Sequence, residues 1–173
     1  MPFTTMFTLT SDRLGSVGAE KKIYNFFFPV STFGGGERVD VMLLQALFRM
    51  FYYEFMGFGS IDPPGGSNGV IKVDGIAGPQ TRMHIHHFQQ HAMMQGWTRT
   101  ADGVIDPFKK QGVVTSHSHV KYQLEILNGE CLKLAFDNNV EGVHQNMIDL
   151  EFHPEEVYPP ELRAALRIPQ VML

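Results

Sequence analysis

Apolar side chains recur at helical spacing over residues 37–56, the strongest periodic pattern in the chain. They stand at every third or fourth position: Val41, Leu44, Phe48, Phe51 and Phe55. Apolar residues also occupy the other faces of this segment, so the predicted helix must be buried on most sides. Asp40 lies near its start, where a carboxylate interacts favourably with the helix dipole.

Two further helices are predicted downstream. Apolar residues recur at helical spacing in residues 79–95, which predicts a second helix. In residues 117–136 an apolar stripe steps by three and four, which favours a third. The first half of that segment also alternates, and Asn128-Gly129 is a strong turn signal, so a β-hairpin is the alternative.

Shorter patterns flank the helices. Weak alternation over residues 3–9 and an aromatic, β-branched run over 23–30 predict strands or an extended arm. Residues 11–22 hold glycines and charges and are typical of a loop. A proline start and a final arginine predict a short helix over 159–167.

The chain is therefore expected to be mainly α, in three parts, with no internal repeat evident. Gly34 to Gly36 mark the clearest boundary. An N-terminal extended arm (1–36) precedes a compact three-helix domain (37–136), and a C-terminal extension (137–173) packs on that core. The Gly- and Pro-rich connection 57–69 is either the rim of a binding site or a tolerated insertion.

A turn motif precedes the second predicted helix. Asp74-Gly75 is a turn dipeptide, because glycine accepts positive φ and aspartate bonds nearby amides. Gly78-Pro79 predicts the helix entrance, since proline at the first helical position loses no hydrogen bond. Thr81 falls in the first turn, where its hydroxyl can bond a free amide.

These residues resemble the signature of the peptidoglycan-binding domain family, a small helical module of many bacterial and phage wall hydrolases. The signature reads Asp-Gly-x-Phe-Gly-Pro-x-Thr-x-x-Ala-Val-x-x-Phe-Gln, and these positions match it: Asp74, Gly75, Gly78, Pro79, Thr81, Phe88 and Gln89. Residues 40–47 are similar to the first helix of the family, and 102–107 to the second Asp-Gly turn of longer members. The sequence departs from the signature at Ala77, where the family has Phe, and at His84, where it has a small core residue.

The resemblance implies a non-catalytic module that binds peptidoglycan or its stem peptide. Four residues would set the turn architecture: Asp74, Gly75, Gly78 and Pro79. Four would contact ligand: Gln80, Thr81, Arg82 and Trp97. Backbone amides at the helix entrance would take a stem-peptide carboxylate. The polar and aromatic side chains would supply hydrogen bonds, charge pairing and a stacking face.

Composition narrows the partners. A net charge of −4 gives no basic footprint, so nucleic acid is not expected. The 14 Phe and 10 Met fit a Phe-rich core with Met filling gaps. The alternative is that some of them form an aromatic surface for a protein partner or a second copy. The single cysteine, Cys131, lies in an apolar pattern and is expected to be buried and inert.

The sequence shows no signal-peptide pattern and no apolar run long enough to span a membrane. A wall-binding protein made in the cytoplasm would then need another route, such as a phage particle, lysis, an injection apparatus or the signal of a partner. The second functional hypothesis follows from this. It is a structural or assembly part of such a particle or apparatus.

Histidines suggest a third hypothesis, a small metal-dependent wall hydrolase. His87 and His91 have the i, i+4 spacing of helical zinc pairs and share a face with His84. Phe88 stands where the catalytic zinc motif needs Glu. Further ligands would come from one of these: His117, His119, His144 or His153. Half-buried histidines without metal are the favoured interpretation, and no cofactor is expected.

Overall fold

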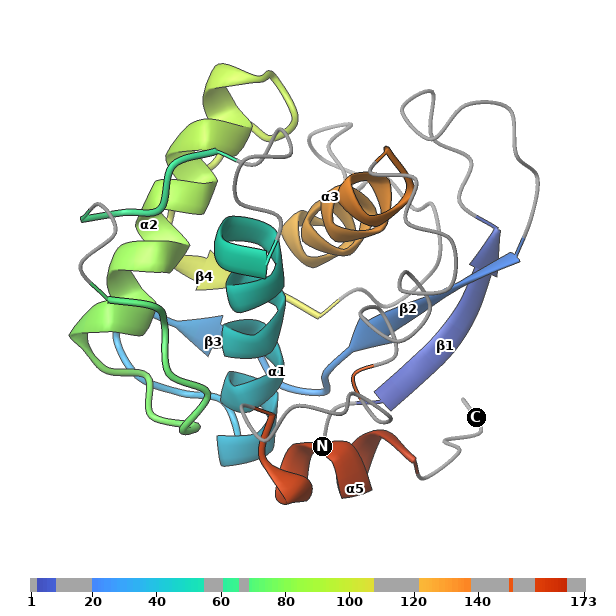
Figure 1. Cartoon of the computed structure of the whole chain (residues 1–173). Coiled ribbons are helices and arrows are strands. Elements are labelled where there is room, and N and C mark those ends of the chain that lie inside the picture. Colours follow the sequence, from blue (N-terminus) through green and yellow to red (C-terminus); the bar gives the residue numbers. More distant parts are fainter. Residues whose placement is uncertain are drawn as a thin grey trace.

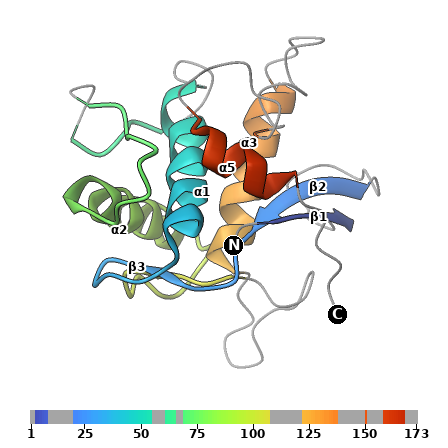
Figure 2. The same ribbon diagram turned by 90° about the horizontal axis from the view of Figure 1, so that it is seen from below.

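The computed structural model describes residues 3–8, 20–54, 61–65, 69–107, 122–137, 150 and 158–167. The fold is mainly helical, as predicted, and is organised around α1 (Arg38–Arg49), which continues directly into a π-helical turn, η1 (Met50–Glu54). Figures 1 and 2 show α2 (Pro79–Met94) and α3 (Gln123–Asp137) on opposite sides of α1. The short α5 (Pro160–Leu166) crosses the end of α1 where that helix begins.

Two small antiparallel sheets complete the fold. β1 (Phe3–Thr8) pairs with β2 (Glu20–Asn25), and β3 (Val30–Ser31) pairs with β4 (Val104–Ile105). The predicted strand 23–30 is thus divided, and residues 20–22, expected in a loop, belong to β2. The ladder with β1 ends at Asn25, so the chain leaves that sheet there. It next pairs at β3, whose partner is β4.

The third helix is a helix rather than a hairpin. Asn128 and Gly129 lie inside α3. The Asn128 side chain accepts a hydrogen bond from the Tyr24 N–H at 2.8 Å and donates to the Tyr24 carbonyl at 2.9 Å. It also donates to the Leu124 carbonyl one turn earlier, at 2.8 Å. The asparagine is therefore a buried bridge between α3 and β2, and its turn preference is overridden by tertiary contacts.

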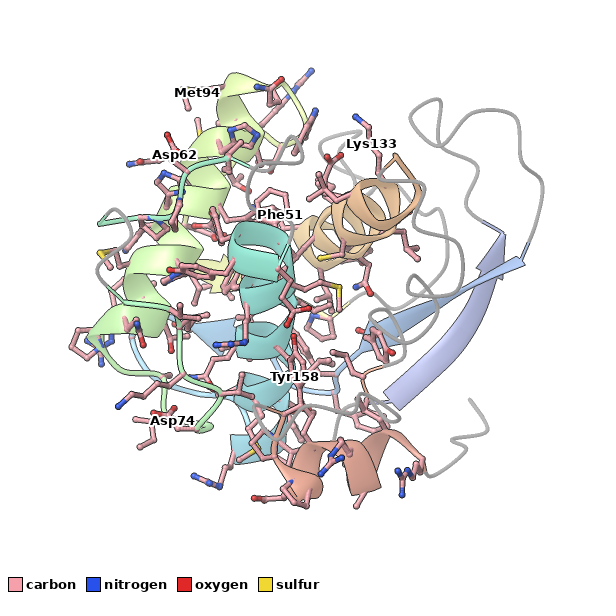
Figure 3. All side chains as sticks on the ribbon, viewed as in Figure 1. Phe51, Asp62, Asp74, Met94, Lys133 and Tyr158 are labelled. Carbon is pink, nitrogen blue, oxygen red and sulfur yellow. The ribbon has the colours of Figure 1, made fainter. Side chains whose placement is uncertain are left out.

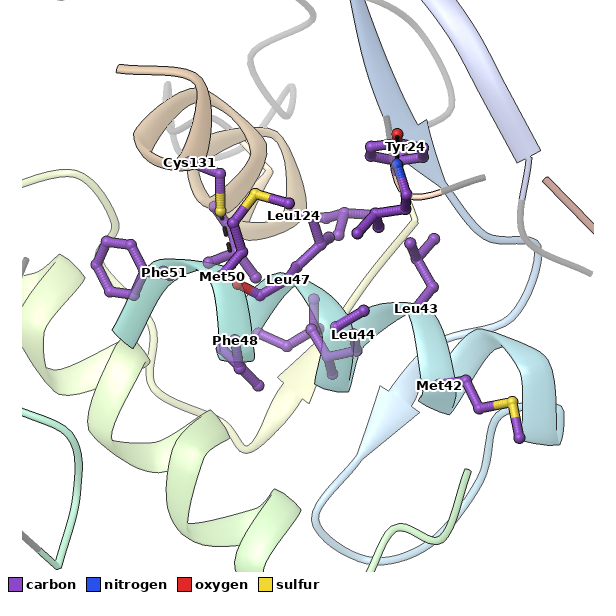
Figure 4. Close-up of a cluster of buried hydrophobic side chains, with 14 of the residues drawn as sticks. Tyr24, Met42, Leu43, Leu44, Leu47, Phe48, Met50, Phe51, Leu124 and Cys131 are labelled. Atoms are coloured by element: carbon purple, nitrogen blue, oxygen red, sulfur yellow. Dashed lines mark hydrogen bonds between the residues drawn. The ribbon is translucent and has the colours of Figure 1, made fainter. Parts of the chain in front are cut away.

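The core surrounds α1, as its all-round apolar pattern predicted. Every residue from Val41 to Phe48 is buried. Figure 4 shows several of these side chains, among them Leu44, Leu47 and Phe48. Asp40, in the first turn, is also fully buried, and burial raises the pKa of its carboxyl to about 6. Cys131 is buried against the Leu47 carbonyl, and burial raises the pKa of its thiol, so it is not a poised nucleophile.

None of the helices within the described ranges has the length and apolar character that a membrane span requires.

The C-terminal region is tied to the central helix by side chains. The Tyr158 hydroxyl donates to Glu54 in η1, and Arg38 pairs with Glu161 of α5 at 3.3 Å. Between α3 and Tyr158 the structure describes only Leu150, which is buried.

Candidate functional site

The turn before α2 is held by one buried glutamine of α1. The side-chain oxygen of Gln45, Oε1, accepts hydrogen bonds from the backbone N–H groups of Asp74 and Gly75, at 3.0 and 2.8 Å. Its amide nitrogen lies 3.0 Å from the Asp74 carboxylate, 3.1 Å from the Ile76 carbonyl and 2.9 Å from the Thr81 hydroxyl. We call this set of residues the first clamp. It fixes the turn and the start of α2 to α1 at a single point.

The turn itself is built as its sequence predicted. The Asp74 carboxylate accepts the Ile76 N–H at 2.9 Å, and Gly75 has a φ of 74°. A Cβ at Gly75 would lie 2.6 Å from Cγ and 2.8 Å from the carbonyl oxygen of Arg38, so only glycine fits. Gly78 is the N-cap of α2 and Pro79 its first residue. These residues are architectural.

A second clamp repeats this arrangement between α2 and α3. The side-chain oxygen of Gln89, Oε1, accepts a hydrogen bond from the backbone N–H of Gly103 at 2.8 Å. Its amide nitrogen lies 3.1 Å from the Asp102 carboxylate, 3.0 Å from the Val104 carbonyl and 2.8 Å from Gln123 at the start of α3. The Asp102 carboxylate accepts the Val104 N–H at 3.0 Å, and Gly103 has a φ of 78°.

The two clamps share the same plan, although no internal repeat is evident in the sequence. In each, a helix glutamine binds an Asp-Gly turn and reaches the first turn of the next helix. The helix positions around the glutamine are buried alike: Asp40, Val41, Leu44 and Phe48 in α1, and His84, Ile85, Phe88 and Ala92 in α2. The structure therefore contains a quasi-repeat of helix, turn and helix start, with α2 shared by both units.

The side chains of two predicted ligand residues are hydrogen-bonded to the protein itself. Thr81 is buried, and its hydroxyl donates to the Ile76 carbonyl at 3.1 Å, so it does not bond a free amide as predicted. The Gln80 side chain donates to the carbonyls of Gly69 and Val70, at 3.1 and 3.3 Å, and accepts the Lys72 N–H at 3.2 Å. Gln80 thus holds the connection 69–72 against α2.

Arg82 and Trp97 lie at opposite ends of α2. Arg82 is exposed, and its Nε donates to the Ala77 carbonyl at 3.2 Å, which places it beside the turn. Trp97 follows the C-terminal end, where its half-buried ring contacts His91 edge-on. Figure 3 shows the separation, with Asp74 near the start of α2 and Met94 at its far end. The structure does not bring these two predicted ligand residues together.

Exposed side chains around the first turn form a mixed apolar and cationic surface. Ile76 is 61% exposed and Val70 is 42% exposed. Lys72 and Arg82 are exposed on either side of the turn. We call these residues the first turn face. Apolar groups next to cations suit a ligand that carries both carboxylates and aliphatic side chains.

The π-helical turn directs two consecutive tyrosines at the histidines of α2, which sequence periodicity did not predict. The Tyr52 hydroxyl lies 3.0 Å from Nδ1 of His87. The Tyr53 hydroxyl lies 2.9 Å from Nε2 of His84 and 3.2 Å from the Gly69 carbonyl. His84 is fully buried, and its Nδ1 donates to the Gln80 carbonyl at 2.8 Å. Such turns concentrate at functional sites, but here the tyrosines join η1 to α2.

Metal binding finds no support in the described ranges, where no three His, Cys, Asp or Glu side chains gather closely enough to hold an ion. His87 is engaged by Tyr52, and His91 contacts Trp97. The other predicted ligands lie outside the described residues: His117, His119, His144 and His153.

Acid is expected to destabilise the fold through His84. Burial lowers the pKa of His84 below its usual 6.5, so the unfolded chain takes up the proton first. The contribution of neutral His84 to the free energy of unfolding is then fully present above pH 6.5 and falls as the pH drops below that value. His84→Asn should reduce the slope of unfolding free energy against pH by up to about 1.4 kcal/mol per pH unit, the value for one proton.

Urea unfolding between pH 7.5 and 5 measures that slope. The groups facing His84 are Tyr52, Tyr53 and His87. His87→Asn provides the comparison, since burial lowers the pKa of His87 as well. An unchanged slope in His84→Asn would show that His84 does not carry this acid sensitivity.

No protein-family model matches the chain, and neither the curated proteins nor the solved structures contain a significant match to it.

Proposed function

We propose that the chain is a non-catalytic module that binds bacterial peptidoglycan through the first turn face. The observation that carries the proposal is the first clamp. Residues that resemble the wall-binding signature, among them Asp74, Gly75 and Thr81, are joined by hydrogen bonds around the buried side chain of Gln45. This arrangement leaves Ile76 and Arg82 exposed at its surface.

The chemistry of the first turn face suits the stem peptide of the wall. Stem peptides carry carboxylates and small aliphatic side chains. Arg82 supplies a guanidinium that can pair with a carboxylate, and Lys72 supplies a second positive charge. Ile76 supplies an apolar contact. Gln80 and Thr81 support this surface from within rather than contacting ligand.

Retention on purified sacculi tests the proposal. Wild-type protein is expected in the pellet, and Arg82→Ala should weaken binding roughly tenfold, the order expected for one charge-assisted hydrogen bond. Arg99→Ala is the matched control, because Arg99 is also exposed but lies beyond the C-terminal end of α2. Wild-type protein that stays in the supernatant would reject wall binding.

One observation favours the assembly hypothesis as a second candidate. Phe27, Phe28 and Phe33 are exposed within a short stretch on the β3 side of the molecule. Aromatic residues are enriched in protein interfaces. An assembly part would elute in gel filtration above the 19.5 kDa of one chain, whereas a wall-binding module of the proposed kind elutes as a monomer. The hydrolase hypothesis has no supporting observation in the described residues.

A further inference from the structure

A chain of hydrogen bonds links the buried His84 to the segment 69–72. Nδ1 of His84 donates to the Gln80 carbonyl at 2.8 Å, so neutral His84 carries its proton on Nδ1 and presents a lone pair on Nε2. The Tyr53 hydroxyl lies 2.9 Å from this Nε2 and 3.2 Å from the Gly69 carbonyl oxygen. A hydroxyl group has one proton, so Tyr53 donates to one of these two acceptors at a time.

The charge on His84 decides which acceptor the Tyr53 hydroxyl serves. When His84 is neutral, Tyr53 donates to Nε2, the shorter of the two contacts. When His84 takes up a proton, Nε2–H donates to the Tyr53 oxygen, and the hydroxyl proton turns to the Gly69 carbonyl. That carbonyl has two lone pairs, of which the Gln80 side-chain amide uses one at 3.1 Å. Protonation therefore redirects the hydrogen bonds without breaking the chain.

We propose that Tyr53 and His84 form a proton-dependent switch that holds the segment 69–72 more tightly when His84 is charged. This segment carries Val70 and Lys72, two residues of the first turn face. The consequence for ligand binding rests on the proposed function. A backbone fixed in advance loses less conformational freedom on binding, so acid should strengthen the binding of wall at the first turn face.

The surroundings of His84 set the pH at which the switch turns. In the part of the chain that the structure describes, the titratable and charged side chains around it are Tyr52, Tyr53, His87 and, acting on Tyr53, Arg49. Burial lowers the pKa of His84 below its usual 6.5, the hydrogen bond to the Gln80 carbonyl opposes this, and His87 lowers it further. Burial raises the pKa of Tyr53, so its hydroxyl keeps the proton. The switch therefore turns below pH 6.5.

Nuclear magnetic resonance tests the switch in the folded protein. The amide nitrogen of Val70 reports on the hydrogen bond to the Gly69 carbonyl, because both atoms belong to one peptide group. Between pH 7.5 and 5, its chemical shift should follow the titration of the His84 ring in the wild type. In Tyr53→Phe, which lacks only the hydroxyl, His84 should still titrate while the Val70 shift stays flat. A Val70 shift that ignores His84 in the wild type, or follows it equally in Tyr53→Phe, overturns the switch.

Tyr52→Phe is the matched control. Tyr52 also pairs with a histidine, through a hydroxyl 3.0 Å from Nδ1 of His87, but this pair includes no atom of the segment 69–72. Burial lowers the pKa of His87, against the opposing effect of Asp62, so His87 titrates in acid as well. The Val70 response should persist in Tyr52→Phe. Its loss there would assign the response to His87 and contradict the proposal.

Retention on sacculi at pH 7.5 and 5 tests the consequence for binding. Wild-type protein should bind roughly threefold more tightly at pH 5, as expected for the net contribution of one hydrogen bond, and Tyr53→Phe should lose this difference. Protonation of the wall itself affects both proteins alike. An equal pH dependence in both would show that the switch does not act on binding. Protein that is not retained at either pH rejects the proposed function, and the Val70 response then decides the switch alone. Circular dichroism at both pH values establishes that each variant is folded.

Discussion

Replacing Gln45 with alanine is expected to destabilise the protein by about 3–5 kcal/mol, the upper range for single substitutions. The first clamp loses its centre. The N–H groups of Asp74 and Gly75 and the carbonyl of Ile76 lose their Gln45 partner in a partly buried place, each at a cost of about 1–3 kcal/mol. The truncated side chain also leaves a cavity beside α1.

Urea denaturation measures this loss. Gln95→Ala is the control, because Gln95 is exposed at the end of α2 and its change should stay within about 0.5 kcal/mol. Gln45→Glu keeps the shape but replaces the donating amide with a carboxylate next to Asp74, so it should also destabilise strongly. A loss below about 1 kcal/mol in Gln45→Ala would mean that the turn is held by other contacts.

Gly75→Ala is expected to cost about 3 kcal/mol or more. An alanine at a φ of 74° carries a penalty of about 1–2 kcal/mol. The added Cβ would also lie 2.8 Å from the carbonyl oxygen of Arg38, an atom of the α1 backbone that cannot move without disturbing the helix. Thermal and urea unfolding report the loss. A variant as stable as wild type would show that the turn can be rebuilt.

Gly103→Ala is the matched comparison at the second clamp. Its Cβ would lie 2.4 Å from the Thr32 hydroxyl, which belongs to a side chain rather than to backbone. The double variant Gly103→Ala/Thr32→Ala should therefore recover the part of the loss due to the clash, leaving only the penalty for positive φ. No removal of one side chain can relieve Gly75→Ala in this way.

The sequence could predict the helices because their apolar spacing is strong and their boundaries carry local signals. Pro79 fixes the start of α2, and the apolar stripe outweighs Asn128-Gly129 in α3. The strands are harder to predict from the sequence than the helices. β3 and β4 are two residues each and exist through a partner far away in sequence, which no local pattern records.

The sequence predicts the turn of the site but not the hydrogen bonds from Gln45 that hold the turn in place. Asp74 and Gly75 carry a clear turn signal, whereas the role of Gln45 depends on a contact across 29 positions. A signal was present, however, since a polar Gln stands among apolar residues in each of two helices and an Asp-Gly follows each. Residue type alone makes Trp97 and Arg82 candidates for the same site, whereas the length of α2 places them at opposite ends of the helix.

The bridge made by Asn128 has a consequence for the order in which the molecule assembles. Tyr24 exchanges both backbone hydrogen bonds with a side chain 104 positions later, and its hydroxyl accepts the N–H of Leu150, 126 positions later. On the ribosome, β2 emerges well before α3 and Leu150, so it must wait until these partners have been made. Contacts of such long range slow folding, so β2 would stay open to proteases and chaperones until Leu150, 126 positions after Tyr24, has been made.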